Sequence, residues 1–323
     1  MRLTATRLLL ALGVIFAAGP YRAQAQDSYP SKPIRLVVGF AAGGPTDIPA
    51  RFIADKLGDL LGQKVVVENK TGAGGMLATR DVLAQPRDGY NLLLCTHFEA
   101  INAAVYRNPQ FTLDDLAPIS LVSKYFYGIA VTNALNTPDW DSFLRHARAN
   151  PGKVSYANIG AGSAQEIFAR ELEKLTGISM TSVPYRGGAP VMQDLLPGRV
   201  QFYVAPTANV MPYVEKGELK VVAISSTERI KTAPDVPTLR EKGIDFVRFG
   251  WLGICAPRGT PEPILARLNK DLRTVVAMPD YQKLIEQTGS IPESSTPVEL
   301  RKIIDQTRHE VAAAVKEFGL ERD

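Results

Sequence analysis

Residues 35–58 read RLVVGFAAGGPTDIPARFIADKLG and place a strand, a loop and a helix start in one short segment. The apolar run at 36–38 predicts a buried strand, and Gly43 and Gly44 leave the following turn almost free of side chains. Apolar residues at helical spacing then predict a helix over 47–61. The segment carries no obvious catalytic side chain, which raises the question of what the loop is for.

The same plan recurs twice along the chain. VVVENKTGAGG at 65–75 leads into a predicted helix over 76–85, and VSYANIGAGS at 154–163 leads into one over 164–176. Loops at the carboxyl ends of strands form the usual ligand crevice of α/β sheets, and a helix N-terminus favours anions. We therefore expect main-chain N–H groups of these loops to hold a carboxylate or a phosphate. The alternative is that the glycines form only tight turns and the polar residues only cap helices.

Short apolar runs alternate with helical patterns through most of the chain, which predicts an α/β fold with mostly parallel strands. Strands are expected at 34–39, 64–68, 91–95, 119–122, 127–132, 154–157, 179–184, 200–205, 219–225 and 250–255. Further helices are expected at 139–149, 189–196 and 208–216, and the chain is largely helical from 261 to 318.

Composition and charge describe an ordinary globular protein with an export signal. The 323 residues are 45% hydrophobic and 22% charged, and the formal net charge of +4 falls to about +1 without the three arginines of the first 25 residues. That small excess does not favour nucleic-acid binding. Residues 1–25 combine arginines, an apolar run at 8–18 and the sequence Ala-Gln-Ala at 23–25. This is the plan of a cleaved secretory signal peptide, with an uncleaved membrane anchor as the alternative.

Cys95 and Cys255 are the two cysteines of the chain. In an oxidising compartment they can form one bridge, but both lie in predicted strands, where a free thiol packs as a small hydrophobe. We favour free thiols and leave the bridge open, because the sequence does not give the Cα separation that a disulfide needs. Neither the cysteines nor the three scattered histidines have metal-ligand spacing, so we expect no metal and no cofactor.

Known catalytic and nucleotide-binding motifs are incomplete in this sequence. GAGGML lacks the last glycine of the dinucleotide fingerprint, IGAGSAQ lacks the lysine of a P-loop, and Ser163 does not lie in G-x-S-x-G. Ser163 and Glu166 have the spacing of a capping box, which favours a structural role for Glu166. Arg186, in the YRGG turn, is either an anion partner or a solvated surface residue. These patterns favour a binding protein over an enzyme.

Seven phrases together resemble the periplasmic solute-binding components of tripartite tricarboxylate transporters, the Bug or TctC-type proteins. They are YPSKPIRLVVGFAAGGPTDIPAR (29–51), VVVENKTGAGG (65–75), DGYNLLL (88–94), ANPGKVSYANIGAGS (149–163), VPYRGGAPVMQDLLPGRVQ (183–201), APDVPTLREKG (233–243) and APRGTPEPILARLNKDL (256–272). Each phrase is weak alone, but their order and spacing are specific and cover nearly all of the expected mature chain.

The resemblance implies a two-lobed type II periplasmic binding-protein fold, with an interlobe ligand cleft and hinge closure around a small carboxylic acid. Lobe 1 is expected at 26–124 and 246–323, and lobe 2 at 125–245. The ligand positions that the resemblance implies are Ala41, Gly43, Gly44, Asp47, Gly160, Gly162, Ser163, Tyr185, Arg186 and Gly187. We add Thr96, Phe98 and Tyr203 as further candidate ligand contacts.

The chain departs from the family pattern near this expected site. Ala41 and Ala42 stand where the family often has paired prolines, and Glu166 stands where it often has a histidine. The stretch at 205–209 also differs from the usual one. The identity of the ligand therefore does not carry over from the family.

Aromatic side chains are common among the candidate positions. Phe98, the run at 125–127, Tyr203 and Trp251 can offer ring contacts to a ligand, although each of them can instead fill a core. Arg186 and helix dipoles supply little positive charge for a tricarboxylate. We therefore favour an aromatic mono- or dicarboxylate of the terephthalate type over citrate.

The predicted function is capture of such an acid in the periplasm by a monomer, and its delivery to the membrane subunits of the transporter without chemistry. Two alternatives stay open. One is a ligand-sensing partner of a two-component system. The other is an exported hydrolase or isomerase whose site is assembled from distant segments of the chain.

Overall fold

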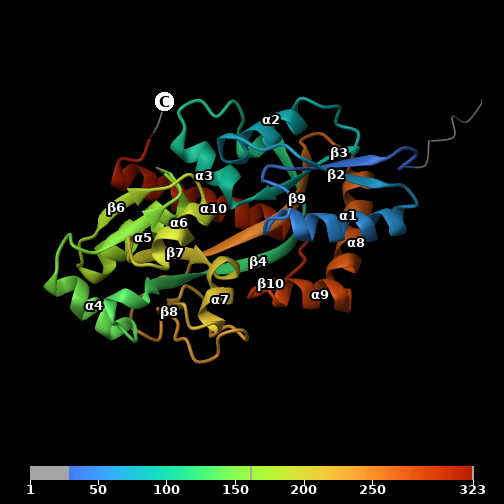
Figure 1. The fold of residues 1–323 in the computed structure, drawn as a ribbon. Coiled ribbons are helices and arrows are strands. Elements are labelled where there is room, and N and C mark those ends of the chain that lie inside the picture. Colours follow the sequence, from blue (N-terminus) through green and yellow to red (C-terminus); the bar gives the residue numbers. More distant parts are fainter. Residues whose placement is uncertain (1–28, 161, 322–323) are drawn as a thin grey trace, which may run out of the picture.

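The structure, a computed structural model, describes residues 29–160 and 162–321, so the predicted signal peptide lies outside the described residues. The chain forms two lobes that share the long strand β4 (Leu116–Thr132) (Figure 1). Lobe 1 holds the blue, teal and orange elements, and lobe 2 holds the green and yellow ones. No helix within the described ranges is long and apolar enough to cross a membrane.

We define lobe 1 by the strand order β2-β1-β3-β9-β4 and lobe 2 by the order β4-β7-β5-β6. Lobe 1 contains β1 (Ile34–Val38), α1 (Asp47–Leu61), β2 (Val65–Asn69), η1 (Ala73–Gly75), α2 (Met76–Leu83), β3 (Asn91–Thr96), α3 (His97–Val105), η2 (Leu113–Asp115), β9 (Phe249–Pro257), α8 (Glu262–Val276), α9 (Pro279–Glu286) and β10 (Ser290–Pro292). Lobe 2 contains η3 (Asn133–Leu135), α4 (Trp140–Ala149), β5 (Ser155–Asn158), α5 (Ala164–Thr176), β6 (Thr181–Pro184), α6 (Gly188–Leu195), β7 (Phe202–Pro206), α7 (Thr207–Glu215) and β8 (Leu219–Ile224). The α/β class is confirmed.

The strands are parallel only in the outer parts of the sheet. β1 pairs in parallel with β2 and β3, and β5 pairs in parallel with β6 and β7. β4 and β9 are antiparallel to each other and to β7 and β3, respectively. The prediction of mostly parallel strands is therefore wrong at the centre, because β4 carries the chain from lobe 1 into lobe 2 and β9 carries it back.

Strand β4 unites the two strands predicted at 119–122 and 127–132. Its first part, as far as Phe126, pairs with β9, and its second part, from Tyr127, pairs with β7 and β8. Lys124 interrupts the apolar pattern between them, but its Nζ pairs with Glu293 at 2.7 Å while the backbone stays in the sheet. The lobe boundaries at 124/125 and 245/246 stay a prediction.

The two helices that follow the first and third glycine loops span the residues predicted for them. α1 and α5 both end at a glycine in the left-handed conformation, Gly62 with φ 69° and Gly177 with φ 67°. Ser163 begins α5, because its side chain accepts a hydrogen bond from the Glu166 N–H. The glycines mark the ends of both helices, and the Ser163 cap marks the start of α5; Thr46 makes no such cap for α1.

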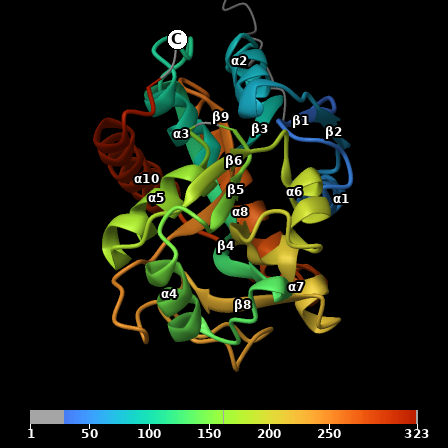
Figure 2. The same ribbon diagram turned by 60° about the vertical axis from the view of Figure 1, so that its left-hand side comes forward.

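The C-terminal helix α10 (Pro297–Phe318) packs against both lobes (Figures 1 and 2). Leu300 and Ile304 in its first half belong to a core of lobe 1, whereas Val311 and Val315 belong to a core built mainly by lobe 2. The helix therefore packs on cores of both lobes.

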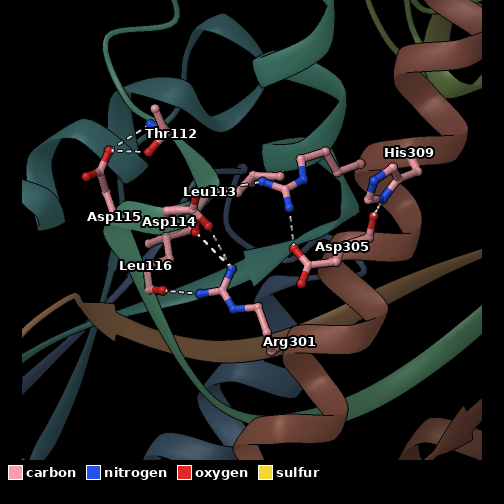
Figure 3. A network of polar contacts seen from close by, with 9 residues as sticks. Thr112, Leu113, Asp114, Asp115, Leu116, Arg301, Asp305 and His309 are labelled. Carbon is pink, nitrogen blue, oxygen red and sulfur yellow. Dashed lines mark hydrogen bonds and ion pairs between the residues drawn. The ribbon is translucent and has the colours of Figure 1, made fainter.

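Polar contacts are made near both ends of α10. Figure 3 shows Arg301, whose guanidinium donates to the carbonyl oxygens of Leu113 and Leu116 in lobe 1. Near the other end, Lys174 of α5 forms an ion pair with Glu317. The partly buried contacts of Arg301 tie the first half of the helix to lobe 1, whereas the Lys174–Glu317 pair is exposed and adds little to the packing of the last turns.

Cys95 of β3 and Cys255 of β9 form a disulfide, with their Cα atoms 5.8 Å apart. The preference for free thiols is therefore wrong. Cys95 lies opposite Gly253, two residues from Cys255 on the neighbouring antiparallel strand, and this register gives the separation that a disulfide needs. Because Cys95 directly precedes Thr96, the bond fixes the end of the strand that leads into the candidate site.

Candidate functional site

The first glycine loop of lobe 1 closes around the carboxylate of Asp47. This buried side chain accepts hydrogen bonds from the Gly43 N–H at 2.8 Å and from Arg51 Nε at 2.7 Å. Asn69 donates to it at 2.8 Å and to the carbonyl of Phe40 at 2.9 Å. Burial acts to raise the pKa of Asp47, but these hydrogen bonds outweigh burial and hold the pKa below its ordinary value. Asp47 therefore shapes the loop, and the Gly43 N–H is already used.

The start of α3 lies next to this loop. Thr96 accepts a hydrogen bond from the Phe98 N–H at 3.1 Å, and the Glu99 carboxylate accepts from the N–H and the hydroxyl of Thr96 at 2.6 and 3.0 Å. Burial raises the pKa of Glu99 to about 6. Thr96 is thus a buried helix cap. Phe98 is only half-buried, and its ring centroid lies 5.3 Å from that of Phe40, so these two rings form an aromatic face beside the loop.

The glycine loop of lobe 2 is also satisfied by its own side chains. The Gly160 N–H donates to Asn158 Oδ1 at 2.9 Å, and the Gly162 N–H donates to Glu166 Oε2 at 2.7 Å. Glu166 has a structural role, as predicted, but not through a reciprocal capping box: its carboxylate accepts from the Gly162 N–H, while its own N–H donates to Ser163 Oγ at 3.4 Å. Ser163 is a buried cap. We expected main-chain amides of these loops to be free for an anion; those of Gly43, Gly160 and Gly162 are occupied instead, because a short polar side chain lies within reach of each.

Two other helix starts in lobe 2 have no side-chain cap. They are the start of α6 after Gly187 and the start of α7 after Pro206. Their first N–H groups and their helix dipoles supply the partial positive charge that suits an anion. A side-chain carbon built on Gly188 would lie 3.5 Å from Asn209 Nδ2 and 3.8 Å from the Tyr203 hydroxyl, so α6, α7 and β7 bring polar atoms to one place.

The remaining predicted residues of the YRGG turn differ in their surroundings. The Tyr185 hydroxyl donates to Asp194 Oδ2 at 3.0 Å, so this side chain already has a partner within lobe 2. Arg186 is exposed to solvent. Of the two, Arg186 is therefore the group available to an approaching anion.

Glycine positions in both lobes border open space. A side-chain carbon built on Gly43, Gly160 or Gly187 would meet no atom within 4 Å. At Gly162, by contrast, such a carbon would lie 2.7 Å from the Val105 side chain at the end of α3, so the lobe 2 loop packs directly on lobe 1 there. The three open positions can be approached without moving a side chain, and ligand contact at them stays a prediction.

Most of the predicted aromatic contacts lie in the interior. Trp251, Tyr127 and Tyr203 are each 1% exposed, and Trp251 belongs to a core of lobe 1. The Tyr127 hydroxyl lies 3.1 Å from His97 Nε2, and burial lowers the pKa of His97 to about 3, so the imidazole is neutral at pH 7. In the run at 125–127, Phe126 is also buried, but Tyr125 is only partly buried and lies against His97. The partly exposed rings around the start of α3 are therefore Phe40, Phe98 and Tyr125.

The described side chains support binding better than reaction chemistry. Ser163 is used as a cap, and His97 is buried against tyrosines. Within residues 29–160 and 162–321, no group of three or more His, Cys, Asp or Glu side chains is placed to hold a metal ion. The arrangement can orient a small anion at helix starts and shield it with aromatic rings.

Sequence reasoning missed the asparagines that support the loops. Asn69 ends VVVEN and Asn158 ends VSYAN, so each occupies the last strand position before a glycine loop. The Asn158 side chain accepts a hydrogen bond from Gly160 in the loop that follows it. The Asn69 side chain instead donates to the carbonyl of Phe40, in the first glycine loop. This shared position was the available signal. Phe40 and Asn209, next to or within motifs that had been singled out, were also missed.

Comparison with known proteins agrees with this architecture. Residues 49–320 match the family model described as the tripartite tricarboxylate transporter family receptor, TctC. The chain is 34% identical to the periplasmic binding protein BugD, with a TM-score of 0.80 over 91% of this chain and 100% of that one. It is 28% identical to Rpa4515 of R. palustris, solved with adipate, with a TM-score of 0.82 over 90% and 98% of the two chains. It is 29% identical to MatC of Rhodopseudomonas palustris, solved with bound malate, with a TM-score of 0.78 over 89% and 100%.

These matches confirm the predicted two-lobed fold and the predicted family. They exclude the enzyme alternative, because the members of the family are solute-binding proteins. The family model covers most of the chain, and the solved relatives are covered almost completely. This chain therefore belongs to the TctC family of tripartite tricarboxylate transporter receptors.

Proposed function

We propose that this protein captures a small carboxylic acid in the periplasm and delivers it to the membrane subunits of a tripartite tricarboxylate transporter. The lobes close around the acid by a hinge motion, and the acid leaves unchanged. The observation that carries the proposal is a pair of uncapped helix starts, those of α6 and α7, in a protein of this receptor family. Relatives solved with adipate and with malate support the same class of ligand.

Among the predicted site residues, we propose as ligand contacts those that are exposed to solvent or border open space. Gly43, Gly160 and Gly187 border open space, and Arg186 and Phe98 are at least partly exposed. Ala41 and Gly44, also partly exposed, complete the contacts that we propose in the first loop. The buried predicted residues that cap helices or tie loops together act by shaping the site; they are Asp47, Thr96, Gly162 and Ser163.

Among carboxylic acids we favour an aromatic mono- or dicarboxylate, with terephthalate as the reference compound. The half-buried rings of Phe40 and Phe98 offer edge and offset-stacked contacts to an aromatic ligand. Arg186 is one exposed cation in the proposed site, which suits one or two negative charges better than three.

Isothermal titration calorimetry with terephthalate, benzoate, adipate, malate and citrate tests this proposal. An acid that binds should stabilise the folded protein by about 2.7 kcal/mol at a concentration of 100 Kd, and NMR should recover it unaltered. Arg186→Gln should weaken binding about tenfold through the lost charge-assisted hydrogen bond, whereas Arg145→Gln on the exposed face of α4 should not. Failure of all five acids to bind would refute the capture of carboxylates, and binding of citrate alone would refute the aromatic preference.

Delivery needs a separate experiment. The acid-loaded protein should be retained by membranes that contain the small and large subunits of the transporter, and retained less without the acid. Retention by a sensor kinase alone would favour the signalling alternative.

A further inference from the structure

The sheet of lobe 1 ends in a strand whose outer edge has no neighbouring strand. β2 is the last strand in the order β2-β1-β3-β9-β4, and among the described strands it pairs only with β1. Its sequence VVVEN contains no proline, and its ladder with β1 runs without a bulge. Folded proteins usually blunt or cover such an edge, because its N–H and C=O groups can pair with another strand. The outer edge of β2 is therefore a candidate interaction surface.

Alternate residues of β2 direct their main-chain groups outward. The Ile34 N–H of β1 donates to the carbonyl of Lys64, directly before β2, at 2.9 Å. In a parallel ladder every second residue bonds to the same neighbour, so the even-numbered residues of 64–70 bond toward β1. The N–H and C=O groups of Val65 and Val67 consequently point away from the sheet. A groove of about 680 Å³ between β2 and α1 leaves room beside them.

One face of this strand carries an exposed and ordered pattern of side chains. Lys64, Val66 and Glu68 are exposed, Val66 with 52% of its surface, whereas Val65 and Val67 on the other face pack against a core of lobe 1. The exposed pattern is cation, valine, anion. Such a pattern is self-complementary, because reversing its direction exchanges the two charges and leaves the valine at the centre.

One antiparallel register matches two copies of this pattern. When Val66 lies opposite Val66 of a second copy, Lys64 lies opposite Glu68, and Val65 lies opposite Val67. Val65 and Val67 then exchange their outward N–H···O=C bonds across the new pair of strands. The three exposed side chains meet at the non-hydrogen-bonded positions, where cross-strand side chains approach each other most closely.

Other registers lose this match. A slip of two residues places Lys64 opposite Lys70 or opposite Val66, and a slip of one residue brings outward main-chain groups against groups that already bond to β1. Glu68 can take part although Arg35 Nη2 donates to its Oε1 at 2.8 Å, because a carboxylate offers about four acceptor positions. The charges and the main chain of β2 therefore favour the same register.

We propose that two copies of this chain associate through β2, with Val66 at the two-fold axis, so that the sheets of both copies of lobe 1 become one continuous sheet. Exposed ion pairs contribute little, so the association is weak, and the dilute protein stays the monomer that the sequence predicts. β2 and the shared strand β4 lie at opposite ends of the sheet of lobe 1. The contact is therefore separate from the candidate site, and the inference does not depend on the capture of an acid.

Sedimentation velocity from about 10 µM to about 1 mM protein tests the association. The sedimentation coefficient of the wild type should rise with concentration toward that of a dimer. Lys64→Glu and Glu68→Lys should each weaken dimerisation about tenfold or more, because like charges then face each other twice in every interface. The double variant K64E/E68K should restore dimerisation, and a mixture of the two single variants should form heterodimers. Lys216→Glu, an exposed charge reversal in lobe 2, should change nothing.

Cross-linking locates the two-fold axis. Val66→Cys should form a disulfide between copies under mild oxidation, because Cα atoms of a non-hydrogen-bonded pair lie about 4.5 Å apart, within the range of a disulfide. The native cysteines are already bonded to each other, and Val298→Cys, which is 64% exposed on α10, is the matched control that should not cross-link.

Three results would each overturn the inference. They are a monomer at every concentration, dimerisation that no charge reversal weakens, and cross-linking of Val66→Cys no faster than that of the control. If Glu68→Lys does not fold once it loses Arg35, then Lys64→Glu and Val66→Cys decide the outcome, since neither removes that ion pair. Acid binding by the wild type is measured separately, and its failure would leave this inference in place.

Discussion

Reduction of the Cys95–Cys255 disulfide should cost the protein about 5 kcal/mol of unfolding free energy. The bond joins residues 160 positions apart. The chain-entropy relation gives about 4.7 kcal/mol for a loop of 100 residues, and it grows only with the logarithm of loop length, so about 5 kcal/mol follows here. Both cysteines are fully buried in the sheet of lobe 1. The relation counts only the restriction of the unfolded chain, so about 5 kcal/mol is the entropic part of the cost.

Urea unfolding of three samples measures this cost. They are the oxidised protein, the same protein under a phosphine reductant, and the variant Cys95→Ala/Cys255→Ala. The first two share one sequence, so their difference isolates the bond, and the double variant should not respond to the reductant. Denatured, unreduced protein that reacts with two equivalents of a thiol reagent would show that the bond is absent. A difference below about 1 kcal/mol in protein with a proven bond would refute the entropic explanation.

Three further predictions concern the loops. Asp47→Asn should lower the unfolding free energy by about 2 kcal/mol at pH 7. Because the folded pKa of this carboxyl is depressed, the difference from wild type in thermal unfolding should shrink below the ordinary Asp pKa of 3.8 and vanish only as the pH falls through the lower folded pKa. Glu99 has a raised pKa of about 6, so it contributes about 2 kcal/mol of stability that is present below pH 4.5 and lost as the pH rises through 6; Glu99→Gln should remove that slope, and an unchanged slope would assign it to other groups. Gly162→Ala should destabilise by about 1–3 kcal/mol, because φ is +76° and the new carbon would lie 2.7 Å from Val105; a double-mutant cycle with Val105→Ala should recover part of the loss, and no recovery would place all of it in the backbone.

The sequence predicts those parts of the fold whose ends are marked locally. The ends of α1 and α5 follow from C-terminal glycines, and the start of α5 follows from its Ser163 cap. The start of α1 follows only from its apolar spacing, because Thr46 makes no capping hydrogen bond. α3 was missed although Thr96 and Glu99 form a capping box, because the helix follows β3 without a loop. The disulfide was not predictable, since it depends on the register of two strands that lie 160 residues apart in sequence.

The loops of the candidate site were predictable from the sequence. Which of their main-chain N–H groups are already hydrogen-bonded to side chains was not. Glycine-rich segments mark where the backbone can approach a ligand, and Gly43, Gly160 and Gly187 do border open space. The sequence does not show which way a nearby polar side chain turns. Asp47 and Glu166 turn back onto their own loops and occupy the N–H groups of Gly43 and Gly162. In lobe 2, the helix starts without a side-chain cap are those of α6 and α7.

Helix α10 is a rod of 22 residues with one half seated in each core. Because its halves pack in different cores, a change in the angle between the lobes requires one half of the helix to shift against its core. The last turns of the chain, as far as the buried Leu320, are therefore part of whatever sets the aperture between the lobes. A tag or fusion added at the C-terminus would therefore disturb the packing of α10, and removal of the last residues would change that packing as well.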